Sequence, residues 1–198
     1  MSMNTPNKLT IARMIATPVF MAITLIEAIP FRFLIALILF AAASLTDMID
    51  GKMARKYNLV TDFGKFLDPL ADKMLTTSAY LAFIFVFRTT QYAWHMVAIV
   101  FIVLFREFMV SSLRLVTVSS GGKVVAANMW GKLKTVSQMV GIVLALFAYV
   151  LIGDFGMTEI AGVLDAVIIV LFWISAVLCV ISGGIYLAAC KDYINPNK

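Results

Sequence analysis

Six long apolar stretches restrict the folds that this chain can adopt. Together with the polar turns beside them, they approach the ~20 residues that an α-helix needs to cross a bilayer. Hydrophobic residues make up 62% of the chain, and its mean hydropathy is +0.98, above that of soluble domains. We therefore predict an all-α polytopic membrane protein, a bundle of six transmembrane helices, with residues 1–198 in a single domain. The stretches lie at about residues 9–29, 32–50, 74–87, 92–118, 136–152 and 161–190.

Basic residues are distributed unevenly over the ends of these stretches. By the positive-inside rule, we expect a multi-pass protein of the inner (cytoplasmic) membrane of the cell, with both termini and residues 44–73 on the cytoplasmic face. No signal-peptide cleavage pattern precedes the first stretch, so we expect that helix to be retained. The net charge of +5 suits anionic lipids and substrates, whereas no soluble basic module is present to bind nucleic acid. The expected cytoplasmic segments hold Lys8, Lys52, Arg55, Lys56, Lys65, Lys123, Lys132, Lys134, Lys191 and Lys198, against Arg32 and Arg88 opposite.

Residues 44–73 carry a regular pattern of acidic and small residues. The pattern is Asp47-x2-Asp50-Gly51-x2-Ala54-Arg55, then eight residues, then Gly64-x3-Asp68-x3-Asp72. Helical spacing places each pair of aspartates on one face, so two packed helices would bring four carboxylates together. Such oxygen ligands favour hard divalent cations, Mg²⁺ or Mn²⁺. An intramembrane proton or ion relay is the alternative, but it does not require the Gly and Ala-Arg spacing.

This pattern resembles the signature of the CDP-alcohol phosphotransferases, membrane enzymes that make phospholipids from a CDP-activated donor and an alcohol. The resemblance implies that Asp47, Asp50, Asp68 and Asp72 hold two divalent ions. It further implies that Asp72 is the catalytic general base. For Thr10, a helix cap is the alternative interpretation. The donor-binding residues that the resemblance implies are Asn7, Thr10, Gly51, Ala54, Arg55 and Gly64.

Charged residues also interrupt an apolar stretch in the second half of the chain. Arg106 and Glu107 lie inside it, and Arg114 follows Glu107 by seven residues on nearly the same helix face. Charges at such depth are costly, so these side chains should face the protein interior. Either Glu107 and Arg114 form a structural ion pair, or the two arginines hold an anionic substrate and Glu107 orients one of them.

The start of the fifth stretch carries a polar stripe. Its members share one helix face and offer an ammonium, a hydroxyl and an amide beside a small residue, which suits a phosphate monoester. Snorkelling at the membrane interface is the alternative for Lys123 and Lys132, and it fits Lys134 less well. The stripe consists of Gly131, Lys134, Thr135 and Gln138.

Three groups of residues narrow the resemblance to family members that make phosphatidylglycerophosphate. They are Pro6-Asn7-x-Leu9-Thr10-x2-Arg13, Arg106-Glu107-Phe108 with Arg114, and Gly131-Lys132-Leu133-Lys134-Thr135-x2-Gln138. They imply transfer of a phosphatidyl group from CDP-diacylglycerol to sn-glycerol 3-phosphate by a homodimer in the lipid membrane. The acceptor phosphate would contact Arg106, Arg114, Lys132 and Lys134. The alternatives are a sibling enzyme that uses serine, inositol phosphate or phosphatidylglycerol, and a divalent-metal transporter.

We predict packing or surface roles for several other residues. Cys179 and Cys190 lie about 16 Å apart along one helix, too far for a disulfide. His95 is expected at the membrane interface, and Asp62 at a helix cap or the surface. Ser182-Gly183-Gly184 predicts a close contact between helices.

Overall fold

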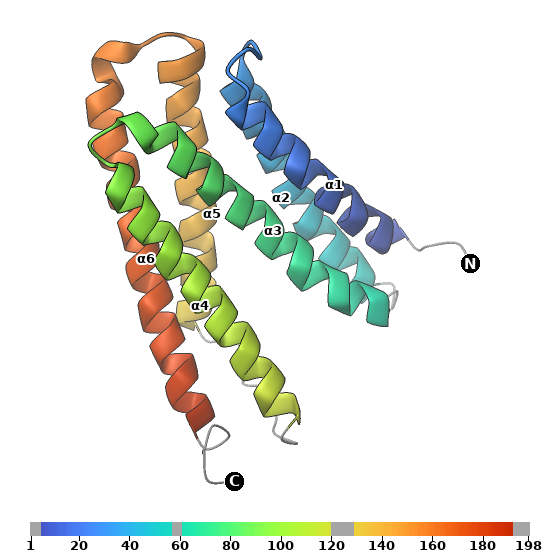
Figure 1. The fold of residues 1–198 in the computed structure, drawn as a ribbon. Coiled ribbons are helices and arrows are strands. Elements are labelled where there is room, and N and C mark those ends of the chain that lie inside the picture. Colours follow the sequence, from blue (N-terminus) through green and yellow to red (C-terminus); the bar gives the residue numbers. More distant parts are fainter. Residues whose placement is uncertain (1–4, 57–60, 120–128, 192–198) are drawn as a thin grey trace. The chain divides into compact units, whose positions relative to one another are not determined.

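The computed structural model describes residues 5–56, 61–119 and 129–191, except the side chains of residues 5, 6, 48–56, 62, 63, 65 and 66. Within these ranges the regular structure is entirely helical (Figure 1), which confirms the predicted all-α fold. Short 3₁₀ segments, Phe87–Thr89 and Thr158–Ile160, and a π-helical turn, Val150–Asp154, join the longer helices. The α-helices are α1 (Thr5–Leu25), α2 (Arg32–Lys56), α3 (Asp62–Val86), α4 (Ala93–Ser119), α5 (Met129–Tyr149) and α6 (Ala161–Cys190).

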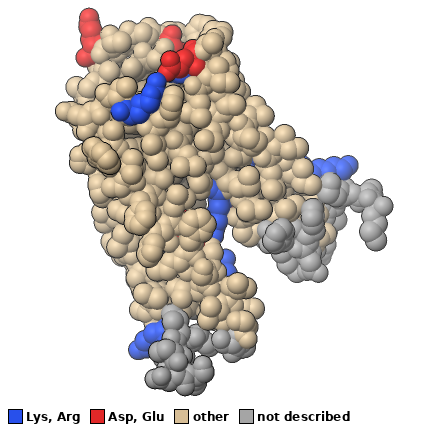
Figure 2. All heavy atoms as spheres, in the orientation of Figure 1, with Lys and Arg blue, Asp and Glu red and all other residues tan. Residues whose placement is uncertain are grey.

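Five helical segments in the described ranges are long and apolar enough to cross a membrane. The protein is therefore of the multi-pass membrane class. The part of α2 with described side chains, residues 32–47, is shorter than one span. On the face drawn in Figure 2 charged side chains are sparse, and the acidic ones gather at the upper end, beside the turn between α5 and α6. The five segments are Asn7–Leu25, Leu67–Thr89, Ala93–Ser119, Met129–Asp154 and Thr158–Cys190.

The chain divides into two compact units. Unit 1 comprises residues 1–88 and 142–164, and unit 2 comprises residues 89–141 and 165–198. The prediction of a single domain over residues 1–198 stays a prediction.

An aromatic core holds unit 1 together. The Tyr149 ring lies 5.2 Å from Phe33, 6.1 Å from Phe83 and 5.7 Å from Phe87, measured between ring centroids. Such tilted and edge-on pairs add to the free energy gained by burying the rings. Helix α1 packs against both α2 and α3, so it links the two helices that carry the aspartates.

Asp154 stabilises the start of α2 within unit 1. Its carboxylate accepts hydrogen bonds from the backbone N–H groups of Phe33, at 3.4 Å, and Leu34, at 2.8 Å. An acid at this position satisfies free N–H groups and interacts favourably with the helix dipole. Gly153 beside it must be small, because a Cβ there would come 2.5 Å from the Phe33 ring.

Unit 2 consists of α4 with parts of α5 and α6. A cluster of Val110, Leu113, Tyr186 and Cys190 joins α4 to α6, and Met109 packs against it. Large apolar side chains on α4, such as Phe101 and Phe108, are exposed, as expected for a helix that faces lipid. Cys179 and Cys190 are both buried and free, in agreement with the packing role predicted for them.

Candidate active site

Two charged clusters lie in the described residues, one in each unit. The first contains the motif residues on α2 and α3. Asp47 is partly buried on α2, while Asp68 is exposed and Asp72 partly buried on α3. The side chains of Asp50, Gly51, Ala54 and Arg55 lie outside the described residues, although all four belong to α2.

Helix α1 contacts an aspartate on each of these two helices. Arg13, whose side chain is 1% exposed, forms an ion pair with Asp47 of α2, whose side chain is 41% exposed. The Thr10 hydroxyl, one turn earlier on α1, donates a hydrogen bond of 2.8 Å to Asp68 of α3. Thr10 lies inside α1, so it is not a helix cap. The two contacts fix one carboxylate on each helix through a single element.

A polar corner joins α1 to the start of α3. Thr61 caps α3, because its hydroxyl accepts a hydrogen bond of 3.0 Å from the Gly64 N–H. The Asn7 amide donates to the same hydroxyl at 3.0 Å. A Cβ on Gly64 would come 2.8 Å from Asn7 Oδ1, so glycine permits this approach. The N-cap of α3 is therefore Thr61 and not Asp62. The alternative, a surface position for Asp62, stays a prediction, because its side chain lies outside the described residues.

The donor atoms of the first cluster are carboxylate oxygens, which suit a hard divalent cation. Among the described residues, no group of three or more His, Cys, Asp or Glu side chains lies close enough together to hold a metal ion. Because this set excludes the Asp50 side chain, convergence of the four aspartates stays a prediction.

The second cluster lies in unit 2 and joins α4 to α5. The Glu107 carboxylate accepts hydrogen bonds from Arg106 Nη1, at 3.2 Å, and from Lys134 Nζ. The exposed side-chain fractions are 12% for Arg106, 16% for Glu107 and 8% for Lys134. With two cations and one anion, these three side chains carry one excess positive charge. Gln138, one turn after Lys134, is also buried and lies 3.5 Å from Cys179 Sγ through its amide nitrogen.

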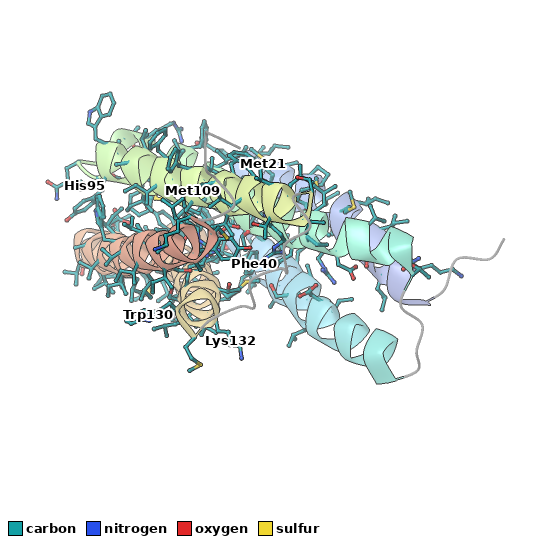
Figure 3. All side chains as sticks on the ribbon, turned by 90° about the horizontal axis from the view of Figure 1, so that it is seen from below. Met21, Phe40, His95, Met109, Trp130 and Lys132 are labelled. Atoms are coloured by element: carbon teal, nitrogen blue, oxygen red, sulfur yellow. The ribbon has the colours of Figure 1, made fainter. Side chains whose placement is uncertain are left out.

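The other two predicted acceptor residues are exposed. Arg114 is exposed on α4, so the expectation that its side chain faces the protein interior was wrong. Lys132 extends away from α5 (Figure 3). Glu107 forms ion pairs with Arg106 and Lys134. The ion pair of Glu107 with Arg114 that the sequence suggests stays a prediction. Roles for Arg114 and Lys132 in substrate binding stay predictions.

From the sequence, Arg13 was named only as part of the resemblance, Thr61 was given no role, and Ser182 was expected only to pack. Ser182 lies in unit 2, where its hydroxyl accepts a hydrogen bond of 2.6 Å from Arg106 Nη2. The spacing of Thr10 and Arg13 was a usable signal, because residues three apart share a helix face.

His95, at the start of α4, accepts a hydrogen bond of 3.3 Å from Trp173 Nε1.

These features define a class, a multi-pass α-helical membrane protein with one acid-bearing cluster and one basic cluster. The family model for CDP-alcohol phosphatidyltransferase matches residues 3–183. This chain belongs to the CDP-alcohol phosphatidyltransferase family. Members of this family generally depend on a divalent metal ion.

Three curated relatives share the name CDP-diacylglycerol--glycerol-3-phosphate 3-phosphatidyltransferase. The Bacillus subtilis protein is 47% identical over 70% of this chain and 74% of its own length. The Rickettsia bellii protein is 38% identical over 96% of this chain and 97% of its own. The Haemophilus influenzae protein is 32% identical over 100% of this chain and 98% of its own.

Proposed function

We propose that this chain transfers the phosphatidyl group of CDP-diacylglycerol to sn-glycerol 3-phosphate, forming phosphatidylglycerophosphate and releasing CMP. The names of its relatives support this activity, because the similarity to each of them spans most of both chains. The observation that carries the choice of acceptor is the largely buried group of Arg106, Glu107 and Lys134 with its excess positive charge. Buried cations are costly in a membrane protein, and an anionic ligand offsets that cost.

The aspartates of unit 1 would hold the metal ions. Asp47, Asp50, Asp68 and Asp72 are the ligands that we propose for two ions of Mg²⁺ or Mn²⁺. When bound, such ions neutralise charge on a leaving phosphate and polarise the phosphorus. The contacts of Arg13 with Asp47 and of Thr10 with Asp68 support this role, because they hold two of the carboxylates in fixed places.

The remaining residues of unit 1 would bind the donor and activate the acceptor hydroxyl. Asp72 is the proposed general base, which removes the proton from the acceptor hydroxyl as that oxygen attacks phosphorus. Arg55 would contact a donor phosphate through its guanidinium. Gly51, Ala54 and Gly64 would leave room for the nucleotide, and Asn7 and Thr10 would add polar contacts. The corner of Asn7, Thr61 and Gly64 supports this, because polar groups meet there around a residue without a side chain.

The acceptor phosphate would bind in unit 2. Arg106 and Lys134 are the proposed principal contacts, and Glu107 holds both in place. A phosphate dianion attracts two fixed cations more strongly than it is repelled by the single carboxylate between them. Arg114 and Lys132 are exposed. They would contact the acceptor phosphate before it reaches Arg106 and Lys134, or at the edge of that site.

We further propose the inner membrane as location, with both termini and the active site cytoplasmic, and a homodimer as assembly. The distribution of Lys and Arg supports the orientation. In the described residues the ion pair of Glu27 with Arg88, at 3.0 Å, lies at the ends of helices on the predicted outer side. Labelling of single introduced cysteines in intact cells would test the orientation.

Release of CMP tests the function directly. The purified protein would be given CDP-diacylglycerol and Mg²⁺ with glycerol 3-phosphate, serine, inositol phosphate or phosphatidylglycerol, and Asp72→Asn would serve as control. We expect release with glycerol 3-phosphate alone and none from the variant. Release with another acceptor would replace the proposed substrate. Metal flux into sealed vesicles without CMP release would favour the transporter.

A further inference from the structure

Ser182 brings a third helix to the basic cluster of unit 2. Its hydroxyl oxygen accepts a hydrogen bond of 2.6 Å from Arg106 Nη2, across 76 residues of sequence. Ser182 is buried, with 1% of its surface exposed, so water does not compete for this contact. Hydrogen bonds in which one partner is ionised are among the stronger ones in proteins. The contact therefore holds the guanidinium in one orientation.

The surroundings of Arg106 reinforce that orientation. Its Cγ would lie 3.1 Å from a Cβ on Gly183, so the glycine after Ser182 leaves room for the arginine stem. Nη1 donates to Glu107 at 3.2 Å, while Nε is buried and has no hydrogen-bond partner among the described residues. A buried donor without a partner is costly, and an oxyanion would remove that cost.

We propose that Ser182 is a positioning residue for the acceptor phosphate. This rests on the proposed function and adds to it a residue that acts through Arg106. Glu107 accepts from Nη1 and Ser182 accepts from Nη2, so Nε is a donor that remains for a phosphate monoester. Without the hydroxyl, phosphate binding would first have to order the arginine, which weakens binding. The loss should affect the acceptor and leave the lipid donor unchanged.

Replacing Ser182 tests this proposal, because KM for the acceptor should change while kcat and KM for the donor should not. In Ser182→Ala we expect KM for glycerol 3-phosphate to rise about tenfold, the size expected for one hydrogen bond to a charged group. KM for CDP-diacylglycerol and kcat should stay within about twofold of the wild type, because the interaction concerns acceptor binding. Ser175→Ala is the matched control, since Ser175 is also buried on α6 but its hydroxyl contacts Ser137 at 3.3 Å. We expect the control to leave both KM values unchanged.

Two further variants keep the test decisive if Ser182→Ala does not fold. Ser182→Cys nearly preserves volume but offers a weak acceptor, and should raise KM for glycerol 3-phosphate as alanine does. Ser182→Thr keeps the hydroxyl and should retain the wild-type KM. Folded Ala or Cys variants with an unchanged KM would overturn the proposal, as would equal changes in both KM values. Wild-type protein that does not use glycerol 3-phosphate would overturn the proposed function itself, before any variant is compared.

Discussion

Arg13 of α1 and Asp47 of α2 form an ion pair in which the arginine side chain is almost fully buried and the carboxylate is partly open. The arginine therefore fixes the aspartate while leaving part of the carboxylate accessible. Removal of one partner of a buried pair leaves the other charge uncompensated. The pair thus links the packing of α1 to the position of the Asp47 carboxylate.

Arg13→Gln should reduce CMP release by roughly 10- to 100-fold, the range over which small displacements of a catalytic group act. The cause is lost positioning of Asp47. Arg88→Gln is the control, because Arg88 pairs with Glu27 at the surface and both side chains are well exposed. Initial rates at saturating substrates measure the effect. An Arg13→Gln variant that is folded and as active as Arg88→Gln would contradict the positioning role.

Thr10→Val should raise the Mg²⁺ concentration needed for half-maximal activity by about tenfold, because Asp68 loses the 2.8 Å hydrogen bond that orients it. Valine has nearly the shape of threonine, and Thr10→Ser restores the hydroxyl. Thr17→Val is a matched control, since Thr17 is also buried on α1 but its hydroxyl donates to the Arg13 backbone oxygen at 2.9 Å. Binding of Mn²⁺ followed by calorimetry should shift in parallel. Equal metal dependence in the Thr10 and Thr17 variants would refute the contact's role.

Glu107→Gln should destabilise the protein by about 3 kcal/mol, because the buried Lys134 and the largely buried Arg106 would then lose the anion that both contact. Thermal unfolding in detergent measures this. Glu27→Gln removes the carboxylate of an exposed pair and should cost no more than about 1 kcal/mol. Inorganic phosphate should stabilise Glu107→Gln more than the wild type, since the anion replaces the lost charge. The absence of any such difference would argue against an anion site at this cluster.

The sequence predicted the helices well, but it did not predict the contacts between them. The apolar stretch at 161–190 matches the range of α6, because continuous hydrophobicity directly reflects a membrane helix. The motif aspartates were readable from their spacing. The sequence did not predict the contacts of Arg13, Ser182 and Asp154, because each partner comes from a helix distant in sequence.

Gly153→Ala should destabilise unit 1 by about 1–3 kcal/mol, because the new Cβ would overlap the buried Phe33 ring. Gly162→Ala is the control: nothing lies within 4 Å of its Cβ position in α6, and alanine favours a helix there. The melting temperatures of the two variants in one detergent give the comparison. A Gly153→Ala variant as stable as Gly162→Ala would show that the packing of the turn on α2 is looser than described.

Incorporation of labelled sn-glycerol 3-phosphate into lipid tests the proposed reaction most directly. The purified protein would receive CDP-diacylglycerol, the labelled acceptor and Mg²⁺, and both CMP and labelled lipid would be quantified. We expect equal amounts of phosphatidylglycerophosphate and CMP, and neither product after chelation of the metal or in Asp72→Asn. Folded protein that releases CMP without labelling lipid, or that labels lipid equally well with Asp72→Asn, would contradict the proposed chemistry.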